Sequence, residues 1–470
     1  MRVSTRAPGV LLLSTYELGN QPFGLASPAA WLRAAGADVT CRDLAVDDLD
    51  EAEAAAAGLV AIHVPMHTAS RLAAPLAERV RRLNPQAHLC FYGLYASVNE
   101  EYLRGIGAGT ILGGEFEEGL VSLYRRLCGG RGTVDVQIEP VISLARQEFL
   151  VPDRTGLAAL DRYAHLTVGS ERRTVGYTEA TRGCKHTCRH CPIVPVYGGK
   201  FRTVGRDVVL ADVRQQVAVG AEHISFGDPD FFNAPGHALP LVRALHAEFP
   251  ALTYNVTIKV EHLVRYSHHL AELQATGCLF VITAVESFDD AILDRLDKRH
   301  TRAGFEAALV TCRELGLALT PTFVAFSPWT TLEGYVDFLD TVAALDLVDS
   351  VAPVQYAIRL LIPAGSLLLD LAEVAELVDA FDAAALVHPW RHPDPAVDRL
   401  QEEVTAAVSA AANSDDPAAA FAQVRRLAYA AAGLGDPVPH PRPDPPGARR
   451  PVPRMSEPWY CCAEPLATGL

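Results

Sequence analysis

The sequence predicts an α/β protein with two parallel-sheet domains, a Rossmann-like domain followed by a partial barrel of six β/α units. Short apolar segments alternate with helical patterns from residue 9 to about 128, and the alternation starts again at Thr174. Strands and helices in turn, with Gly or Pro at the joints, form parallel sheets covered by helices. A chain of 470 residues also exceeds what a single hydrophobic core usually fills.

The first domain, residues 9–128, is expected to contain five strands. They are predicted at 9–15, 37–44, 58–65, 87–93 and 109–115, with helices such as 27–36 and 68–84 between them. Residues 129–172 show no sustained period, and we interpret them as a linker that packs on both neighbours.

The second domain, residues 173–366, is expected to be the partial barrel. Its strands are predicted at 174–180, 223–228, 253–258, 278–286, 318–326 and 350–358. The working face of such a fold lies at the carboxyl ends of its strands. Ala-rich helical patterns then fill residues 367–434, and a Pro-rich tether, residues 435–470, carries the sequence CCAEP near its end.

The charge balance limits the partners. Lys and Arg total 41 against 56 for Asp and Glu, which gives a formal charge of −15. Such a surface repels phosphate backbones, so a nucleic-acid partner is not expected.

No apolar stretch is long enough for a signal-peptide core or a membrane span, and we therefore expect a soluble, cytoplasmic protein. Its ten cysteines are then thiols or metal ligands rather than disulfides.

Three cysteines lie on one loop, TRGCKHTCRHCP, directly after the first barrel strand. Cys184, Cys188 and Cys191 have no fourth cysteine nearby, because the next one is Cys278. Three thiolates can hold a 4Fe-4S cluster and leave one iron open. The alternative is a zinc site completed by His186 or His190. We favour the cluster, because the loop lies on a parallel-strand unit and lacks a second pair of ligands.

The cysteine loop resembles that of radical S-adenosylmethionine (SAM) enzymes with cobalamin-type N-terminal domains. The resemblance implies a 4Fe-4S cluster whose open iron chelates SAM. It also implies that SAM contacts residues at the ends of three other barrel strands, namely Gly227, Asp228, Asp230, Glu286, Ser287 and Arg359. Two of these positions also have a structural alternative. Ser287 would cap a helix instead of contacting SAM, and Arg359 would form a surface ion pair.

The N-terminal domain looks like a cobalamin-binding domain. Its ILGGE segment resembles the one that such domains carry where the fifth strand meets its helix, and there Gly113, Gly114 and Glu115 would approach the corrin. The segment after the first strand lacks the Asp-x-His-x-x-Gly element that supplies a lower axial histidine. Two interpretations stay open: cobalamin binds without that ligand, or the domain binds nothing and only shapes the substrate pocket.

The C-terminal tail carries adjacent thiols, Cys461 and Cys462, after Trp459 and Tyr460. It resembles the CUAEP/CCAEP-tail radical SAM (seleno)protein family, in which selenocysteine can replace the first cysteine. This implies a catalytic role for the two thiols, as a redox group or in substrate capture.

The sequence therefore predicts a radical SAM enzyme that acts on a small molecule and takes electrons from a reductase, flavodoxin or ferredoxin. The most specific hypothesis, implied by the tail, is transfer of the 3-amino-3-carboxypropyl group of SAM to trivalent arsenic, as in arsinothricin formation. One alternative is cobalamin-dependent methylation or rearrangement of a small metabolite. A second, from another class, is a non-catalytic cobalamin or redox sensor with a structural cluster.

Overall fold

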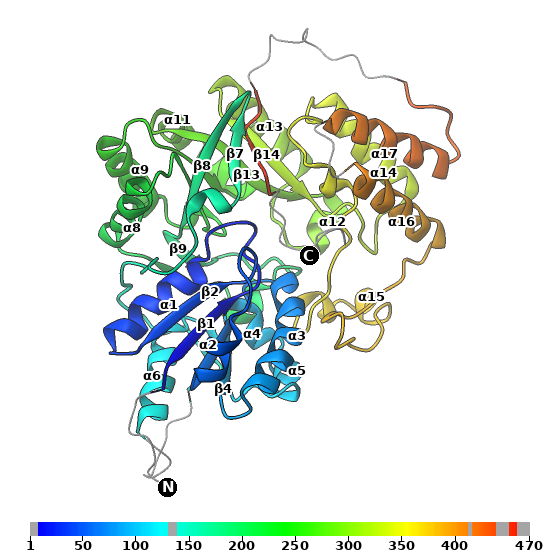
Figure 1. The fold of residues 1–470 in the computed structure, drawn as a ribbon. Coiled ribbons are helices and arrows are strands. Elements are labelled where there is room, and N and C mark those ends of the chain that lie inside the picture. Colours follow the sequence, from blue (N-terminus) through cyan, green and yellow to red (C-terminus); the bar gives the residue numbers. More distant parts are fainter. Residues whose placement is uncertain (1–7, 130–138, 412–415, 439–450, 458–470) are drawn as a thin grey trace.

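A computed structural model describes residues 8–129, 139–411, 416–438 and 451–457. Two sheets, each covered by helices, lie next to each other, with the N-terminal sheet below the larger one in the view of Figure 1. The predicted α/β class and the order of the two sheets are confirmed.

The N-terminal sheet has six parallel strands in the order β2-β1-β3-β4-β5-β6. Five were predicted, and the sixth, β6, comes from the segment interpreted as a linker. The elements are β1 (Val10–Ser14), α1 (Phe23–Ala34), β2 (Val39–Asp43), α2 (Glu51–Ala56), β3 (Leu59–His63), α3 (His67–Leu83), β4 (His88–Tyr92), α4 (Leu94–Val98), α5 (Glu100–Gly105), β5 (Thr110–Gly114), α6 (Glu117–Cys128) and β6 (Ile142–Ser143).

Strand β1 explains why the N-terminal sheet is buried on both faces. All its residues are buried, and they alternate between two cores: Val10 and Leu12 pack towards α1 and α6, whereas Leu11 and Leu13 pack towards α2, α3 and α5. A continuous apolar run is the pattern of a parallel strand covered on both sides.

The larger sheet has seven strands in the order β14-β13-β12-β11-β8-β7-β15. Strands β8, β11, β12, β13 and β14 are parallel and form the curved barrel wall. Strands β9 and β10 form a separate two-stranded sheet. The elements of this part of the chain are β7 (His165–Val168), β8 (Glu171–Thr178), β9 (Thr181–Gly183), α7 (Ile193–Tyr197), β10 (Phe201–Thr203), α8 (Arg206–Ala218), β11 (His223–Phe226), α9 (Pro235–Glu248), β12 (Thr253–Thr257), α10 (Val260–Arg265), α11 (Leu270–Ala275), β13 (Cys278–Glu286), α12 (Asp290–Arg295), α13 (Arg302–Glu314), β14 (Ala318–Phe323), α14 (Leu332–Ala344) and β15 (Arg454–Met455).

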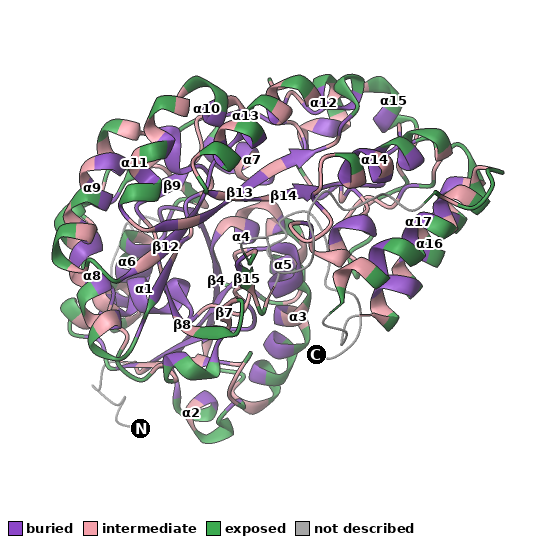
Figure 2. Ribbon diagram, turned by 90° about the horizontal axis from the view of Figure 1, so that it is seen from above, coloured by how far each residue is buried: buried purple, intermediate pink, exposed green. Residues whose placement is uncertain are grey.

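The barrel wall has an outer and an inner apolar layer. Along β13, Val281 and Val285 belong to the large core under the helices, whereas Phe280 and Ile282 belong to the small inner cluster. Figure 2 shows this arrangement from above, with buried strands in the middle and exposed residues on the outer sides of the helices.

The predicted sixth barrel strand, 350–358, is not a strand in the structure. Residues Pro353–Tyr356 form a short 3-10 helix, η4, and strand-like pairing is reduced to one parallel bridge between Phe326 and Arg359. Pro353 has no amide hydrogen to donate to a neighbouring strand, and it begins the short helix instead.

The region predicted as a helical appendage contains a short 3-10 helix η5 (Leu367–Asp370) and the helices α15 (Ala372–Ala375), α16 (Pro395–Ala410) and α17 (Pro417–Ala431). A mixed apolar cluster joins the two domains: Tyr16, Met66 and Tyr95 from the carboxyl edge of the N-terminal sheet pack with residues such as Leu296 and Ile358. The strand ends of the two sheets therefore face each other.

Candidate functional site

The three cysteines lie at the carboxyl end of the first barrel strand, as predicted. Cys184 follows β9, which pairs with β10 in a small antiparallel ladder beyond the end of β8. Asn233, in the short helix η2 (Phe231–Asn233) after β11, lies with Oδ1 3.3 Å from the amide nitrogen of Lys185 and 3.8 Å from Cys184 Sγ. The amide of Arg189 donates to the carbonyl of Leu296 at 3.0 Å. Segments after β11 and β13 therefore hold the loop.

The thiols suit an iron-sulfur cluster by number and surroundings. Cys188 is buried, and Cys184 and Cys191 are half-buried. Burial raises the pKa of Cys184 to about 11, so the free thiol keeps its proton at neutral pH and a bound metal must displace that proton. Among the described residues, the other cysteines lie elsewhere in the fold, most of them buried in strands or helices of the cores. The donor set is thus three thiols from one loop.

Gly227 and Asp228 follow β11 and contact the segment that leads to the cysteines. A Cβ at Gly227 would lie 1.8 Å from the hydroxyl oxygen of Tyr177, so only glycine fits here. The Asp228 carboxylate accepts hydrogen bonds from the amide of Ala180 (3.0 Å) and the hydroxyl of Thr181 (2.5 Å). Burial raises the pKa of Asp228 to about 7. This carboxylate binds its own chain, and contact with SAM stays a prediction for it.

Asp230 forms a buried cluster with two histidines that the sequence did not single out as a set. Its Oδ2 lies 2.5 Å from His262 Nδ1 and 3.3 Å from His186 Nε2, and His186 belongs to the cysteine loop. Burial would raise the pKa of Asp230, but the two neighbouring imidazoles outweigh it and hold the pKa below the usual range. The ammonium of Lys259 lies 3.3 Å from His186 Nδ1. The cluster ties α10 to the loop between Cys184 and Cys188.

Glu286 ends β13 and contacts the same loop. Its Oε1 lies 3.1 Å from His190 Nε2 and 3.0 Å from Lys298 Nζ, and all three side chains are buried. Burial opposes ionisation, but the Lys298 ammonium and His190 outweigh it and hold the pKa of Glu286 well below the usual range. Its φ of 68° lies in the left-handed region beside a register shift in β13, a strained geometry that is typical of functional sites.

Ser287 and Arg359 have contacts that bear on the alternatives named for them. Asp289, not Ser287, caps α12 by accepting from the amides of Ala291 and Ile292, and the Ser287 hydroxyl accepts from the Asp289 amide. The Arg359 guanidinium stacks on Trp390 at 3.6 Å and pairs with Asp398 at 2.8 Å. These contacts match the ion-pair alternative for Arg359.

Gly113 and Gly114 allow a close approach, but of the chain itself. A Cβ at Gly113 would lie 2.4 Å from Ser97 Oγ, and one at Gly114 would lie 2.2 Å from the carbonyl of Ser143 in β6. Gly114 also has a φ of 69°. Gly113 therefore packs against α4 and Gly114 against the unpredicted strand β6, and their contact with a corrin stays a prediction.

Glu115 belongs to a buried charge cluster between the domains. The Arg182 guanidinium lies 2.6 Å from Glu117, 2.8 Å from Glu179 and 3.4 Å from Glu115. Burial raises the pKa of Glu115 to about 7. Arg182 lies two residues before Cys184, so this cluster joins the start of α6 to the cysteine loop.

Two histidines lie at the carboxyl edge of the N-terminal sheet, where a cobalt ligand would be expected. His63 Nδ1 lies 2.7 Å from Glu17, and His67 Nε2 lies 2.7 Å from the carbonyl of Ala385. These two imidazoles at the end of β3 are engaged by the protein, and the loop after β1 contains no histidine. Since His63 and His67 are engaged elsewhere, a corrin fits this edge only without an imidazole ligand from it.

Cys461 and Cys462, predicted as catalytic, lie outside the described residues, as do Trp459 and Tyr460.

No helix in the described ranges is long and apolar enough to cross a membrane.

The comparison with protein families identifies the central domain. Residues 178–339 match the family described as the radical SAM superfamily, and the chain therefore contains a radical SAM domain. This domain begins at the end of β8 and includes the cysteine loop, Asp230 and Glu286. Domains of this kind bind a 4Fe-4S cluster and SAM, which the three thiols fit.

Two curated proteins are similar in sequence to parts of this chain. The tRNA-2-methylthio-N(6)-dimethylallyladenosine synthase of Desulfosudis oleivorans is 26% identical over 47% of this chain and 49% of that protein. The hopanoid C-3 methylase of Methylococcus capsulatus is 24% identical over 70% of this chain and 65% of that protein. The chain thus spans 49% and 65% of the lengths of these two curated relatives.

A solved structure extends the likeness to most of the chain. The cobalamin-dependent S-adenosylmethionine radical enzyme OxsB with aqua-cobalamin bound superposes with a TM-score of 0.67 over 88% of this chain and 70% of that chain, at 14% identity. At this identity the likeness shows the fold.

Proposed function

We propose that this chain is a radical SAM enzyme that acts on a small molecule. The observation that supports it is the loop of three thiols at the carboxyl edge of the barrel, opposite the carboxyl edge of the N-terminal sheet. When bound, a 4Fe-4S cluster with one open iron supplies reductive cleavage of the SAM sulfonium. The chain contributes the placement of the loop, through Asn233, Leu296 and the buried partners of His186 and His190.

The reaction class that we favour is cobalamin-dependent methylation or rearrangement. The N-terminal sheet and the barrel share their arrangement with OxsB, whose solved structure holds aqua-cobalamin, and a hopanoid methylase is related over 70% of this chain. A corrin between the two domains would be bound without an axial imidazole from the loop after β1. Ser287 and the backbone of Gly227 are our candidates for contact with SAM, whereas Asp228, Asp230 and Glu286 act as positioning residues.

The test is anaerobic reconstitution with iron and sulfide, with and without cobalamin, followed by reduction in the presence of SAM. We expect an EPR signal of a reduced 4Fe-4S cluster and the formation of 5′-deoxyadenosine, with S-adenosylhomocysteine as well when cobalamin is bound. A chemical reductant and a flavodoxin should both support the reaction. Cys184→Ala, Cys188→Ala and Cys191→Ala should each lose the cluster and the cleavage.

Cys128→Ala is the matched control, because this cysteine is exposed at the end of α6 and belongs to no predicted site. It should retain the iron content and the turnover. A complete cluster that yields neither nucleoside product would overturn the enzyme proposal and favour the sensor.

The transfer of a 3-amino-3-carboxypropyl group to arsenic is a second candidate. It depends on Cys461 and Cys462, and the last described residue of the tail, Glu457, accepts a hydrogen bond from Tyr16 at the carboxyl edge of the N-terminal sheet. Methylthioadenosine that forms only with arsenite would support this reaction. Equal arsenite binding by the wild type and the Cys461→Ser, Cys462→Ser double variant would exclude the tail as the arsenite site.

A further inference from the structure

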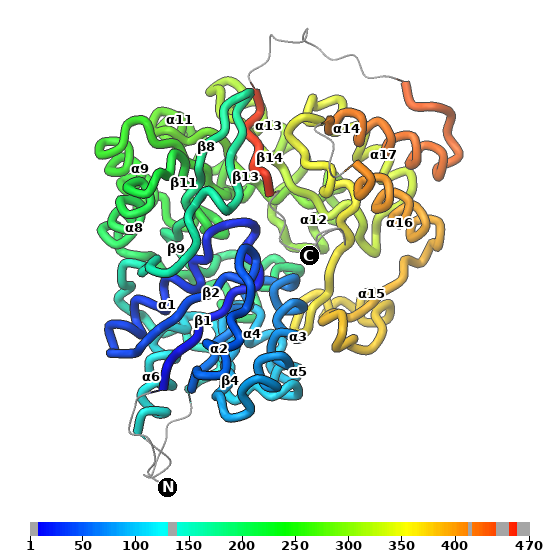
Figure 3. Tube along the Cα trace, viewed as in Figure 1, coloured from blue at the N-terminus to red at the C-terminus, as the bar shows by residue number. Residues whose placement is uncertain are grey.

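Three buried side chains beside the cysteine loop bring their donor atoms close to one point. His186 Nε2, Asp230 Oδ2 and His262 Nδ1 lie within 4.8 Å of one another. They come from three segments, namely the loop after β9, the loop after β11 and helix α10. Figure 3 shows β9 and β11 in the same part of the trace, above the N-terminal domain. The three residues are 6%, 1% and 0% exposed, so bulk water does not reach the donor atoms.

The donor atoms are close together, but they do not form hydrogen bonds with each other. Asp230 Oδ2 lies 2.5 Å from His262 Nδ1 and 3.3 Å from His186 Nε2. Within the described chain, none of these three atoms meets a partner in hydrogen-bond geometry, and neither does His262 Nε2. Buried polar atoms in this condition are rare. Ligand atoms of one metal ion point at the ion and not at each other, so this arrangement fits a common cation.

Asp230 is held so that one carboxylate oxygen faces the imidazoles. Its Oδ1 accepts a hydrogen bond from the amide of Phe232 at 3.2 Å and caps the short helix η2. Its Oδ2 is thereby left on the side of the two histidines. A buried carboxylate needs a compensating positive charge. A divalent ion supplies this charge while both imidazoles stay neutral, as metal ligands must be.

The donor set suits zinc in type and spacing. Imidazole nitrogens and carboxylate oxygens are ligands that Zn²⁺ takes in proteins. Bonds of about 2.1 Å in a tetrahedral arrangement place the ligand atoms about 3.4 Å apart. The 3.3 Å between His186 and Asp230 matches this spacing, and the 2.5 Å pair would open by about 1 Å. A fourth position is left for water or another small ligand, which is typical of zinc sites with three protein ligands.

Glu261 and Lys259 lie behind His186. When His186 Nε2 binds an ion, its Nδ1 carries the proton and needs an acceptor. Glu261 Oε2 lies 3.6 Å from this Nδ1 and is the nearby carboxylate for that role. Lys259 Nζ lies 3.2 Å from Glu261 and 3.3 Å from His186 Nδ1. Without an ion Lys259 can donate to Nδ1, so the ion would change the tautomer of His186.

We propose that His186, Asp230 and His262 form a binding site for a divalent transition-metal ion, which we test with zinc, separate from the site of the three thiols. His186 lies between Cys184 and Cys188. The ion would therefore fasten the cysteine loop to α10 and to the loop after β11. The inference does not rest on the proposed function, because the ion is bound whether or not SAM is cleaved.

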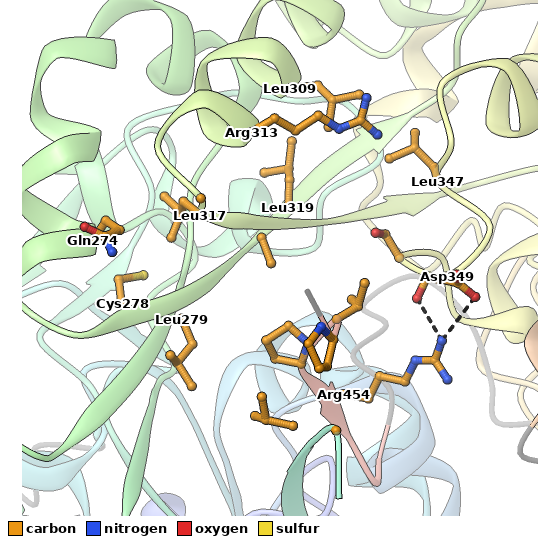
Figure 4. A pocket seen from close by; sticks show the side chains of 18 of the residues that line it. Gln274, Cys278, Leu279, Leu309, Arg313, Leu317, Leu319, Leu347, Asp349 and Arg454 are labelled. Carbon is orange, nitrogen blue, oxygen red and sulfur yellow. Dashed lines mark hydrogen bonds and ion pairs between the residues drawn. The ribbon is translucent and has the colours of Figure 1, made fainter. Parts of the chain in front are cut away.

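The proposed ion lies in the packed interior and not in the large cavity of the barrel. That cavity, of about 990 Å³, is drawn in Figure 4 and lies where β13 and β14 begin, with Cys278, Leu317 and Arg454 in its wall. The dashed lines mark the contacts of Arg454 with Asp349, at 3.2 Å to the carbonyl and 3.5 Å to the carboxylate. The three donors instead follow the carboxyl ends of their strands. A ligand of the cavity and the ion would thus occupy opposite ends of the barrel.

The test counts metal ions in a full-length chain that cannot hold the cluster. Cys184→Ala, Cys188→Ala and Cys191→Ala are combined, and the metal-free protein is titrated anaerobically with Co²⁺, a spectroscopic probe of zinc sites. Visible absorption measures the bound ion, and charge transfer from thiolate to cobalt in the near ultraviolet reveals any binding by the remaining cysteines. We expect about one Co²⁺ per chain without the thiolate band, and its displacement by Zn²⁺.

Two ligand variants and a control locate the ion. His262→Gln and Asp230→Asn, each added to the cysteine-free loop, should weaken Co²⁺ binding by about ten-fold or more. His223→Gln is the matched control, because His223 is also fully buried but its ring nitrogens lie 2.8 Å from Thr253 and 3.0 Å from Asn255. Its affinity should stay within about two-fold. In the wild type, reconstituted with iron, sulfide and zinc, elemental analysis should find about one zinc per chain beside the cluster iron.

Three results would overturn the proposal: no cobalt bound without thiolate ligands, equal binding after His262→Gln, or no zinc in the reconstituted wild type. Each would leave the three side chains as an ion pair between Asp230 and a protonated imidazole. The first and third results need no ligand variant, so a variant that fails to fold does not obscure the outcome. A chain that binds the ion but cleaves no SAM would count against the proposed function alone.

Discussion

The Arg182 guanidinium lies 2.6 Å from the Glu117 carboxylate, and this ion pair joins the two domains inside the protein. Both side chains are at least 90% buried. The Arg182 guanidinium also lies over the rings of Phe23, Phe116 and Phe149, at 5.6, 5.3 and 5.0 Å. Since Cys184 follows two residues later, the position of the cysteine loop depends on the N-terminal domain.

The first prediction concerns this ion pair. Arg182→Met leaves Glu115 and Glu117 buried, and Glu179 half-buried, without their cation, and we expect a loss of about 3–5 kcal/mol in the free energy of unfolding. The measurement is denaturant unfolding of the unloaded protein. Arg104→Met is the matched control, because Arg104 forms an exposed pair with Glu100 at 2.8 Å. It should change stability by less than about 0.5 kcal/mol. Equal effects of the two variants would contradict the buried role.

The second prediction is a pH dependence that originates at Asp228. Burial raises its folded-state pKa from the ordinary 3.8 to about 7, so between these pH values the folded protein binds the proton more tightly than the unfolded chain does. The contribution of Asp228 to stability therefore falls as pH rises from about 4 to about 7.

Asp228→Asn removes this titration while keeping an acceptor for the Ala180 amide. We expect the unfolding free energy of the wild type to fall relative to that of the variant as pH rises through this window. The check is a series of denaturant midpoints between pH 4.5 and 7.5. Parallel pH profiles of the two proteins would show that Asp228 does not titrate in this range.

Most strands of both sheets were predictable because their apolar runs and their Gly or Pro boundaries are local features. Strand β7, of four residues in the segment interpreted as a linker, and the short strands β6 and β15, of two residues each, were not predicted. A strand of two residues has no period to detect, and it exists only because a distant strand pairs with it. The missing sixth barrel strand has the opposite cause: residues 350–358 are apolar enough for a strand but contain Pro353, which begins a short helix instead.

The candidate site was predicted in the same uneven way. The cysteine spacing lies within eight residues, so the sequence alone carries it. The residues that contact the loop could not be predicted from the sequence. His190 and Glu286 are 96 positions apart, and Asp230 meets His186 and His262 only in the folded chain. Glu286 was singled out, but as a SAM contact rather than as the partner of His190 and Lys298.

A third prediction follows from the space beside Gly227. Gly227→Ala would place its Cβ 1.8 Å from the Tyr177 hydroxyl and 2.2 Å from the ring carbon that bears it, and both belong to a half-buried side chain. We expect a loss of about 1–3 kcal/mol in the free energy of unfolding, because the ring must move to make room for the new methyl group. Gly236→Ala, at the start of α9, has nothing within 4 Å of the new Cβ and should be neutral or slightly stabilising. Thermal unfolding compares the two, and equal midpoints would contradict the packing argument.

A fourth prediction separates two roles of Glu286. Glu286→Gln removes the negative charge that faces His190 and Lys298, and His190 lies between Cys188 and Cys191 on the loop. We expect the reconstituted variant to lose iron to a chelator several-fold faster than the wild type, while its SAM affinity per remaining cluster stays within two-fold. Glu306→Gln is the control, since Glu306 forms an exposed pair with Arg302 at 3.1 Å, and it should change neither quantity. If instead iron loss is unchanged and SAM binding weakens ten-fold or more, Glu286 contacts SAM, and its bonds to His190 and Lys298 serve to aim it at the cofactor.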